Sequence, residues 1–360
     1  MAKIDAFFRL MHEQHASDLH LISGQPPVLR IHGDIERVKY KVLDDDDLRK
    51  MLYEITPAEK IKVFEETGDM DFGYEIPGLA RYRGNFFIQK NGIGAVFREI
   101  PNTILTAEQL GLPPVISQLA SLPRGLVIVT GPTGSGKSTT LAAIIDVANR
   151  TRSDHIITIE DPIEFVHKSR GCLVNHREVG LHTKSFSSAL RGALREDPNI
   201  LLVGEMRDLE TISLAVEASA TGHLVFATLH TTSASKTVDR IVEVFPAQEQ
   251  SQIRSTLADG IRAIISQTLF KRVDQRGRIP ALEILIATPA IRNLIREAKS
   301  HQLPSMIQTG KKYGMQLLDD AIMELYTKGQ ISAEDAYSRS NEKSRFRPLL
   351  KSPPTDFTEA

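Results

Sequence analysis

A glycine-rich stretch at residues 131–138 carries the residue types that hold a phosphate. It reads GPTGSGKS and fits the pattern G-x-x-x-x-G-K-[ST] without a gap. Glycines let backbone N–H groups turn toward a phosphate, Lys137 can neutralise the outer phosphates, and the Ser138 hydroxyl can ligate Mg²⁺. An ordinary turn from a strand to a helix needs neither the lysine nor the hydroxyl. We therefore expect a phosphate-binding loop formed by Gly131, Thr133, Gly134, Ser135, Gly136, Lys137, Ser138 and Thr139.

Carboxylates follow two other apolar runs of the chain. Glu160, Asp161 and Glu164 come at the end of one run, and Glu205 comes after another run and a glycine. Hydrolysis of a terminal phosphate needs Mg²⁺ on the phosphates and a water that is oriented and relieved of a proton. We expect Glu205 to act on Mg²⁺, directly or through its water shell, and Glu164 to activate the water. Glu160 and Asp161 either place Glu164 or assist the metal.

His230 and several arginines complete the set of candidate site residues. His230 follows an apolar run that ends at Leu229, where a sensor of the γ-phosphate would lie. Hydrolysis also benefits from an arginine that stabilises developing charge, often supplied by a neighbouring subunit. The candidate arginines are Arg81, Arg83 and Arg98 in the first hundred residues, and Arg195, Arg207 and Arg240 further along.

The elements that must position these residues alternate between strand and helix, which is typical of a parallel sheet. We expect strands at 126–130, 155–160, 200–203 and 223–229, and helices at 138–148, 185–196 and 208–220. Open parallel sheets bind ligands at the carboxyl ends of their strands, so the glycine loop, the carboxylates and His230 should gather at one edge. After Pro246 the spacing of apolar residues predicts one long helix to about Phe270, then a short strand pair around Gln275-Arg276-Gly277 that ends in a strand at 279–286. C-terminal helices follow, the first with Thr288 as its N-cap and Pro289 in its first turn.

The first hundred residues predict a separate small α/β domain. Two β-hairpins are expected, one at 18–32 closed by Gly33, and one at 80–100 that turns at Asn91-Gly92. Prolines 101, 113, 114 and 123 then punctuate a linker. The predicted divisions are 1–99 for this domain, 100–114 for the linker, 115–288 for the nucleotide-binding domain, 289–345 for a C-terminal helical region and 346–360 for a disordered tail.

Composition narrows the class of protein. The 360 residues exceed one typical domain, and 44 Lys and Arg against 45 Asp and Glu lack the basic excess of a nucleic-acid binder. Cys172 is the only cysteine, which excludes an intramolecular disulfide and a cysteine-rich zinc site. No apolar run approaches the roughly 20 residues that span a bilayer. We therefore expect a cytoplasmic protein without a nucleic-acid partner.

Taken together, these stretches resemble the secretion ATPase superfamily. The resemblance rests on Ser17–Leu21 (SDLHL), the glycine loop as Walker A, Ile159–Glu164 as the aspartate box, Ile200–Glu205 as Walker B and Thr221–His230 as the histidine box. Within the superfamily, Ala290–Glu297 (AIRNLIRE) resembles the C-terminal signature of the type IV pilus retraction ATPases. The same stretch also reads as an amphipathic helix that packs Ile291, Leu294 and Ile295.

The resemblance implies a fold, an activity and partners. It implies a PAS-like N-terminal α/β domain, a RecA-like P-loop ATPase core and C-terminal helices. It further implies a homohexameric ring that binds ATP and Mg²⁺ at its subunit junctions. This motor would dock on the inner-membrane platform protein at the cytoplasmic face, act on pilins indirectly, and turn hydrolysis into pilus retraction and twitching motility.

Other functions remain open at this point. Pilus extension and type II secretion ATPases belong to the same superfamily, but the extension ATPases usually carry a longer N-terminal region and a four-cysteine zinc site. A nucleic-acid translocase could use the same core, although the near-neutral charge opposes it. A GTPase or small-molecule kinase is a further class, and the sequence has no N/T-K-x-D segment to read guanine.

Overall fold

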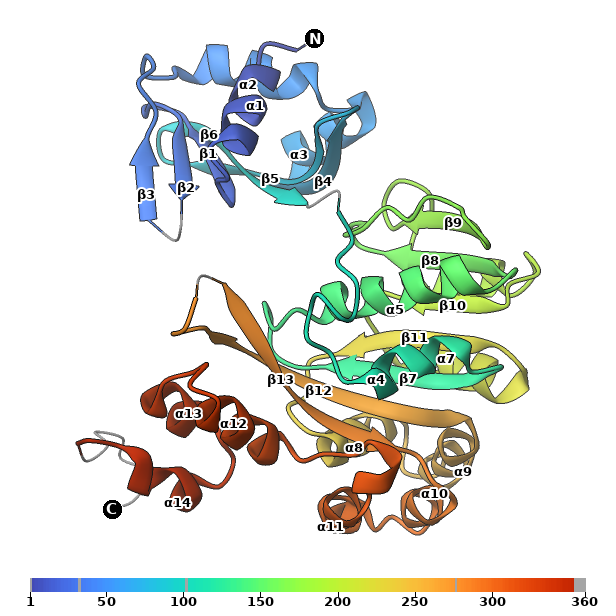
Figure 1. Cartoon of the computed structure of the whole chain (residues 1–360). Coiled ribbons are helices and arrows are strands. Elements are labelled where there is room, and N and C mark those ends of the chain that lie inside the picture. Colours follow the sequence, from blue (N-terminus) through green and yellow to red (C-terminus); the bar gives the residue numbers. More distant parts are fainter. Residues whose placement is uncertain (1, 32–33, 101–102, 276, 353–360) are drawn as a thin grey trace. The chain divides into compact units, whose positions relative to one another are not determined.

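The computed structural model describes residues 2–31, 34–100, 103–275 and 277–352 (Figure 1). The chain divides into two compact units. The first comprises Met1–Thr103 with the short segment Pro162–Val166, and the second comprises Ile104–Asp161 with His167–Ala360. Within the described ranges, no helix is long and apolar enough to cross a membrane.

The first unit is built on a six-stranded antiparallel sheet with the order β3-β2-β1-β6-β5-β4. Alternate residues of the central strands are buried, as in Tyr82, Phe86 and Phe97, and these rings pack against Phe8 and Phe64 of two covering helices. The elements are α1 (Asp5–Glu13), β1 (Asp18–Ile22), β2 (Val28–Ile31), β3 (Asp34–Arg37), α2 (Asp45–Glu54), α3 (Ala58–Thr67), β4 (Asp69–Ile76), β5 (Ala80–Gln89) and β6 (Gly92–Ile100).

Both hairpins predicted for this unit are present. β5 and β6 pair from Arg81 opposite Ile100 to Gln89 opposite Gly92, and β1 pairs with β2. Strand β4 was not predicted. His32, Gly33 and Pro101, which the sequence placed in a turn and in the linker, lie outside the described residues.

The second unit is built on a seven-stranded sheet with the order β13-β12-β7-β11-β10-β8-β9. All neighbours pair in parallel except β12 and β13, which are antiparallel. The strands are β7 (Gly125–Thr130), β8 (His155–Glu160), β9 (Leu173–Glu178), β10 (Ile200–Val203), β11 (Leu224–Leu229), β12 (Ile261–Lys271) and β13 (Arg278–Ile286). The predicted bounds of the strands at 155–160 and 200–203 are confirmed.

Helices cover both faces of this sheet (Figure 1). On β7, Leu126 and Ile128 point into one apolar core and Val127 and Val129 into the other, so the strand is buried on both sides. The helices are α4 (Pro114–Gln118), α5 (Lys137–Thr151), α6 (Phe186–Ala193), α7 (Leu209–Thr221), α8 (Ala234–Glu243), α9 (Gln250–Gly260), α10 (Pro289–Arg296), α11 (Leu303–Thr309), α12 (Leu318–Thr327), α13 (Ala333–Arg339) and α14 (Lys343–Phe346).

Short polar side chains set where five of these helices begin. Each accepts a hydrogen bond from the backbone N–H three residues further on, which satisfies a donor that the helix leaves unpaired. These capping residues are Ser185, Asp208, Ser233, Thr288 and Ser332, at the starts of α6, α7, α8, α10 and α13.

The long helix predicted from Pro246 to about Phe270 is wrong. Helix α9 ends at Gly260, and the chain continues as strand β12, which pairs with β7 on one side and β13 on the other. A strand buried on both faces is apolar at nearly every position, so its spacing fits a helix as well as a strand. Packing requires the glycine at the junction, because a Cβ on Gly260 would lie 2.3 Å from the Ser219 hydroxyl of α7. The strand pair predicted around Gln275-Arg276-Gly277 is present as the antiparallel pair of β12 and β13, and Arg276 itself lies outside the described residues.

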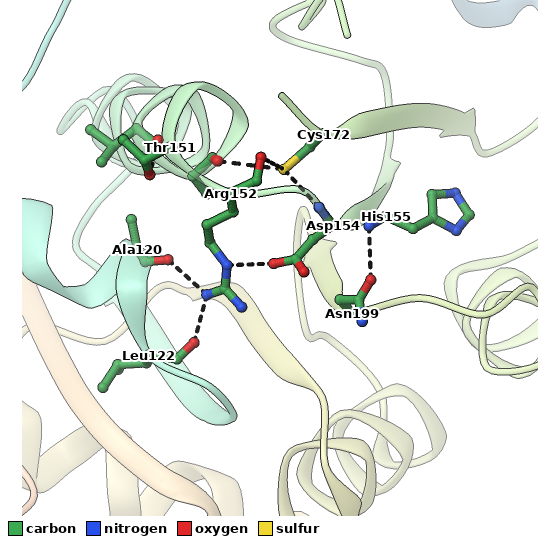
Figure 2. A network of polar contacts seen from close by, with 10 residues as sticks. Ala120, Leu122, Thr151, Arg152, Asp154, His155, Cys172 and Asn199 are labelled. Carbon is green, nitrogen blue, oxygen red and sulfur yellow. Dashed lines mark hydrogen bonds and ion pairs between the residues drawn. The ribbon is translucent and has the colours of Figure 1, made fainter. Parts of the chain in front are cut away.

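A polar network ties together the segments that precede β7, β8 and β9, at the edge where these strands begin (Figure 2). Arg152 donates to the carbonyls of Ala120 at 2.9 Å and Leu122 at 2.7 Å, and it pairs with Asp154. The Asp154 N–H in turn donates to the Cys172 sulfur at 3.4 Å. Cys172 is buried and free, so its place is structural.

The end of the chain contains a further small core. Phe346, which the sequence assigned to a disordered tail, is buried against α12 and α13, and Arg347–Leu349 form a short 3₁₀ helix. Residues 353–360 of that tail lie outside the described residues.

Candidate functional site

The glycine loop joins the buried strand β7 to helix α5. Gly131, Gly134 and Gly136 have φ angles of 141°, 77° and 87°, which L side chains rarely adopt. Gly136 directly precedes α5, so the loop delivers its backbone to the positive end of a helix. The Lys137 ammonium donates to the carbonyls of Gly131 at 2.9 Å and Pro132 at 3.2 Å. The lysine therefore lies over the loop, where a bound phosphate would be.

Gln267 on β12 holds this loop in shape. Its amide Nε2 donates to the Ser135 carbonyl at 2.6 Å, and its Oε1 accepts from the Thr140 hydroxyl at 2.7 Å. The side chain is only 3% exposed. A Cβ on Gly131 would lie 2.2 Å from the Gln267 carbonyl oxygen, so this glycine is required by close approach as well as by its φ angle. Sequence reasoning missed Gln267 because β12 was taken for a helix.

The loop carries polar groups that could bind a ligand, and one of them has no partner within the described residues. The Ser135 hydroxyl is buried and makes no hydrogen bond among the described residues, which is unusual for a buried polar atom. Thr133 and Gly134 are exposed at the tip, and Ser138 and Thr139 are half-buried in the first turn of α5. This donor set suits a phosphate that accepts from backbone amides, a lysine and hydroxyls.

Four neighbouring strands bring the other predicted residues to the same edge of the sheet. Their order is β7-β11-β10-β8, and Thr130 of β7 pairs with Leu229, the residue before His230. Val203, two residues before Glu205, pairs with Ala227 of β11 and Ile159 of β8. Because all four strands are parallel, the segments that follow them emerge side by side.

Glu205 and His230 are in contact. His230 Nε2 lies 3.1 Å from Glu205 Oε1, and Arg207 Nε lies 2.6 Å from the same oxygen. Burial raises the pKa of Glu205, but the hydrogen bond and charge of Arg207, together with His230, outweigh it and hold this pKa below its ordinary value. The same hydrogen bond raises the pKa of Arg207. Glu205 is therefore a carboxylate at neutral pH, as a residue that attracts Mg²⁺ or its waters must be.

The aspartate-box carboxylates are distributed over both units. Glu160 ends β8, is largely buried, and lies 4.0 Å from the ring of His176 on β9. Asp161 is exposed, and its charge acts on Arg207, the partner of Glu205. Glu164 belongs to Pro162–Val166, the segment that groups with the first unit. Its role as the water-activating base stays a prediction.

The candidate arginines of the first unit lie on one face of its sheet. Arg83 and Arg98 are cross-strand neighbours on β5 and β6, and Arg81 is two residues from Arg83. Arg98 pairs with Asp18 of β1 at 2.8 Å, and Arg81 pairs with Glu75 at 3.6 Å. In the second unit Arg240 is exposed on α8. These positions do not show whether an arginine acts in hydrolysis. The residues that remain candidates are Arg81, Arg83, Arg98 and Arg240.

The described parts of the chain contain no group of three or more His, Cys, Asp or Glu side chains that could by itself hold a metal ion. Mg²⁺ is ordinarily bound by one or two protein ligands together with phosphates and waters, so a protein cage is not required. Ser138, Glu205 and Asp161 offer a hydroxyl and carboxylates, which are oxygen ligands of the kind that Mg²⁺ prefers.

Comparison with known proteins gives consistent matches over nearly the whole chain. Residues 107–338 match the family described as Type II/IV secretion system protein. The type IV pilus retraction ATPase PilT of Pseudomonas aeruginosa is 55% identical over 334 residues, 93% of this chain and 97% of that protein. A twitching motility protein of Neisseria gonorrhoeae is 51% identical over 314 residues, 87% of this chain and 84% of that protein. A crystal structure of the pilus retraction motor PilT with bound ADP matches with a TM-score of 0.89 at 44% identity, covering 96% of this chain and 98% of that one.

A mixed α/β fold with a parallel sheet and a glycine loop at its edge defines the class as a nucleotide-binding secretion ATPase. Within that class, the chain belongs to the family of PilT-like type IV pilus retraction ATPases. The resemblance and the fold class predicted from the sequence are confirmed.

Proposed function

We propose that this chain is a motor that hydrolyses ATP to retract type IV pili and so drives twitching motility. The observation that carries the proposal is the contact of Glu205 with His230, at strand ends adjacent to a loop that carries Lys137. The relatives named as a pilus retraction ATPase and a twitching motility protein support the motor role.

Each residue of the loop has a part in binding ATP. The backbone N–H groups of Gly131 and of residues 133–139 and the ammonium of Lys137 bind phosphate oxygens, and Lys137 gives up its hydrogen bonds to the Gly131 and Pro132 carbonyls to do so. Ser138, Glu205 and Asp161 are the residues that would hold Mg²⁺, with the carboxylates acting directly or through water. The ion supplies positive charge to the β and γ phosphates.

Hydrolysis then requires a base for the attacking water, a sensor of the γ-phosphate and an arginine side chain. Glu164 takes a proton from the attacking water, with Glu160 and Asp161 holding the segment that carries it. His230, in contact with the Glu205 carboxylate, reads the γ-phosphate. At least one of Arg81, Arg83 and Arg98, with Arg240 as a further candidate, stabilises the charge that develops on the transferring phosphate.

The assembly we propose is a homohexameric ring with ATP at its subunit junctions. It would work at the cytoplasmic face of the inner membrane on the pilus platform protein, with pilins as indirect partners and without nucleic acid. The divisions 1–99, 100–114, 115–288, 289–345 and 346–360 remain our proposal for the finer domain boundaries.

The test is steady-state ATP turnover of Lys137→Ala. The matched control is Lys328→Ala, because Lys328 is the exposed residue that follows α12 and, within the described part of the chain, its side chain pairs only with Glu324. Lys137→Ala should lose more than about 100-fold in turnover, as is typical when a group that stabilises the transition state is removed. Turnover like that of the wild type would contradict the proposal. In cells, deletion of the gene should cause hyperpiliation with loss of twitching, restored by the wild type and not by Lys137→Ala.

The same assays separate the alternative functions. A pilus extension ATPase would give loss of pili instead of hyperpiliation. Strong stimulation of turnover by DNA or RNA would favour a translocase. A clear preference for GTP over ATP would favour a GTPase.

A further inference from the structure

Strand β13 carries a buried carboxylate between two helix starts. Glu283 is 6% exposed, and its neighbours along the strand, Leu282 and Ile284, are buried apolar residues. Its Oε1 accepts from the backbone N–H of Ala234 at 2.7 Å, and the backbone amide of Leu318 also interacts with this carboxyl. Ala234 is the first residue of α8 and Leu318 is the first residue of α12. One side chain thus joins the starts of two helices, at residues 234 and 318, which are 84 residues apart in the chain.

The position is costly for a carboxyl group, and the helix starts offset only part of that cost. Burial, the largest cause, and the charge of Asp319 hold the pKa of Glu283 above its ordinary value, although the two backbone amides lower it. Helix N-termini present unpaired N–H groups and partial positive charge, which favour a carboxylate. Leu317, which precedes α12, has no side chain able to cap it, so Glu283 supplies the acceptor from another element.

Helix α8 begins directly after the loop that carries His230. Thr231 of this loop and Thr237 of α8 share a hydrogen bond of 2.7 Å, and Thr237 donates to the Ser233 carbonyl at 2.7 Å. The segment 230–233 is therefore held between the end of β11 and the first turn of α8, which Glu283 fixes. A shift of His230 relative to Glu205 would move this first turn against Glu283.

Helix α12 carries the C-terminal helices. Leu318, Ala321 and Ile322 pack with Phe270 and Ala281 of the β12–β13 hairpin, and with Ile331, Tyr337 and Phe346. The same hairpin also reaches the glycine loop and the strand before it. Ser266, which pairs across the hairpin with Glu283, receives a hydrogen bond of 2.9 Å from the hydroxyl of Thr130 at the end of β7, and the next residue, Gln267, donates to the Ser135 carbonyl of the loop. The contacts on both sides of Glu283 thus run from the nucleotide site to the C-terminal helices.

We infer that Glu283 is a positioning residue: it fixes the loop that carries His230 and couples that loop to α12, so that the nucleotide state of the site is passed to the C-terminal helices. This inference rests on the proposed ATP hydrolysis. It concerns a residue that acts through others, since the hydrogen bonds of the Glu283 side chain to the described residues come from backbone amides.

Three variants of the full chain test the inference. Glu283→Ala removes the acceptor, and Glu283→Gln keeps an acceptor oxygen but loses the charge. The matched control is Asp319→Asn, because Asp319 is another buried carboxylate on the first turn of α12. It accepts from the N–H groups of Asn341 at 2.9 Å and Glu342 at 2.7 Å, and neither bond involves α8. Melting temperatures report how much each variant is destabilised.

The first readout is ATP turnover. Glu283→Ala should lower kcat by about tenfold with KM changed by less than about twofold, because the loop is misplaced while the phosphate contacts remain. Glu283→Gln should recover part of the loss, and Asp319→Asn should keep kcat within about twofold of the wild type even where its melting temperature falls. If Glu283→Ala does not fold, a lowered kcat with little change in KM in Glu283→Gln supports the inference.

The second readout is amide hydrogen exchange at Ala321 and Ile322 of α12, with and without ATP. In the wild type, ATP should change the protection of these amides, and the change should be absent in Glu283→Ala and retained in Asp319→Asn.

Two results would overturn the inference while leaving the proposed function intact. The first is a kcat equal to that of the wild type in both Glu283 variants. The second is an equal loss of kcat in Asp319→Asn and Glu283→Ala, which would show that Glu283 has only a structural role. A wild-type chain that turns over no ATP would instead overturn the proposed function. In that case the exchange experiment can be repeated with ADP in place of ATP. If ADP does not change the protection of the α12 amides, the inference is overturned as well.

Discussion

His230 Nε2 lies 3.1 Å from Glu205 Oε1, although the two residues follow different strands and are 25 positions apart by their numbers. The contact exists because β10 and β11 are parallel neighbours whose carboxyl ends lie at the same edge. Arg207, which shares the same oxygen, was a candidate arginine from the sequence, and its contact with Glu205 places it at this edge. The Glu205 carboxylate is thus held by a histidine and an arginine at the edge of the sheet that carries the glycine loop.

The low pKa of Glu205 predicts a pH dependence of stability. Because its pKa in the folded chain lies below the ordinary value of 4.5, Glu205 contributes stability that is present above that value and is lost as the pH falls through the folded pKa. Glu205→Gln should therefore be less stable than the wild type at pH 7, and the two stabilities should converge below pH 4.5. Urea unfolding at several pH values measures this, with Glu210→Gln as an exposed control that also pairs with an arginine. A difference that is constant with pH would contradict the prediction.

Gln267 should be needed to bind nucleotide. Gln267→Ala removes hydrogen bonds to Ser135 and Thr140, and at about 1 kcal/mol for each bond it should weaken ADP binding by about tenfold to thirtyfold. The control is Gln316→Ala, which loses a side-chain hydrogen bond to the Leu282 carbonyl and touches no part of the loop. Isothermal titration with ADP measures the effect, and equal affinities in the two variants would refute a special role for Gln267.

Gly131 should tolerate no side chain. Gly131→Ala combines a φ angle of 141° with a Cβ 2.2 Å from the Gln267 carbonyl oxygen. Gly222→Ala is the matched control, because its φ of 134° is similarly unfavourable but its Cβ would meet no atom within 4 Å. Both variants should lose about 1–3 kcal/mol from backbone strain. Only Gly131→Ala should lose nucleotide binding, and retention of ADP binding in that variant would show that the loop relaxes around the methyl group.

At least one arginine of the first unit should act across a subunit junction. Within the described residues Arg83 makes no ion pair, whereas Arg98 and Arg81 pair with Asp18 and Glu75, so Arg83 is the first to test. Arg83→Ala subunits keep their glycine loop, and Lys137→Ala subunits keep Arg83. Each is expected to be inactive alone, and mixing them should restore part of the ATP turnover at junctions that hold both intact groups. No recovery with any of the three arginine variants would count against the prediction.

Helix α10, which spans most of the signature stretch Ala290–Glu297, shows how much a local sequence pattern can predict. The sequence predicted Thr288 as its cap, Pro289 in its first turn and an inward stripe of Ile291, Leu294 and Ile295. The cap and the proline are confirmed, and Ile291 and Ile295 are buried with Leu294 partly buried beside them. The sequence also left Arg292, Arg296 and Glu297 free to meet partners, but Arg292 donates to the Ala287 carbonyl. In the structure Arg296 pairs with Asp259 of α9 and Glu297 pairs with Lys299, so a partner would have to compete with these ion pairs.

The sequence alone determined the phosphate loop, the bounds of β8 and β10, and the gathering of Glu205 and His230 at one edge of a parallel sheet. These features depend on residues close together in the chain, or on a rule that holds for every parallel sheet. Only the tertiary structure decided that Ile261–Lys271 is a strand, that Gln267 holds a loop 132 residues earlier, and that Glu283 meets the start of a helix 49 residues earlier. The physical reason is that the apolar spacing of a fully buried segment fits a helix and a strand equally well. Its structure, and the partners of its few polar side chains, are set by the strands on either side of it.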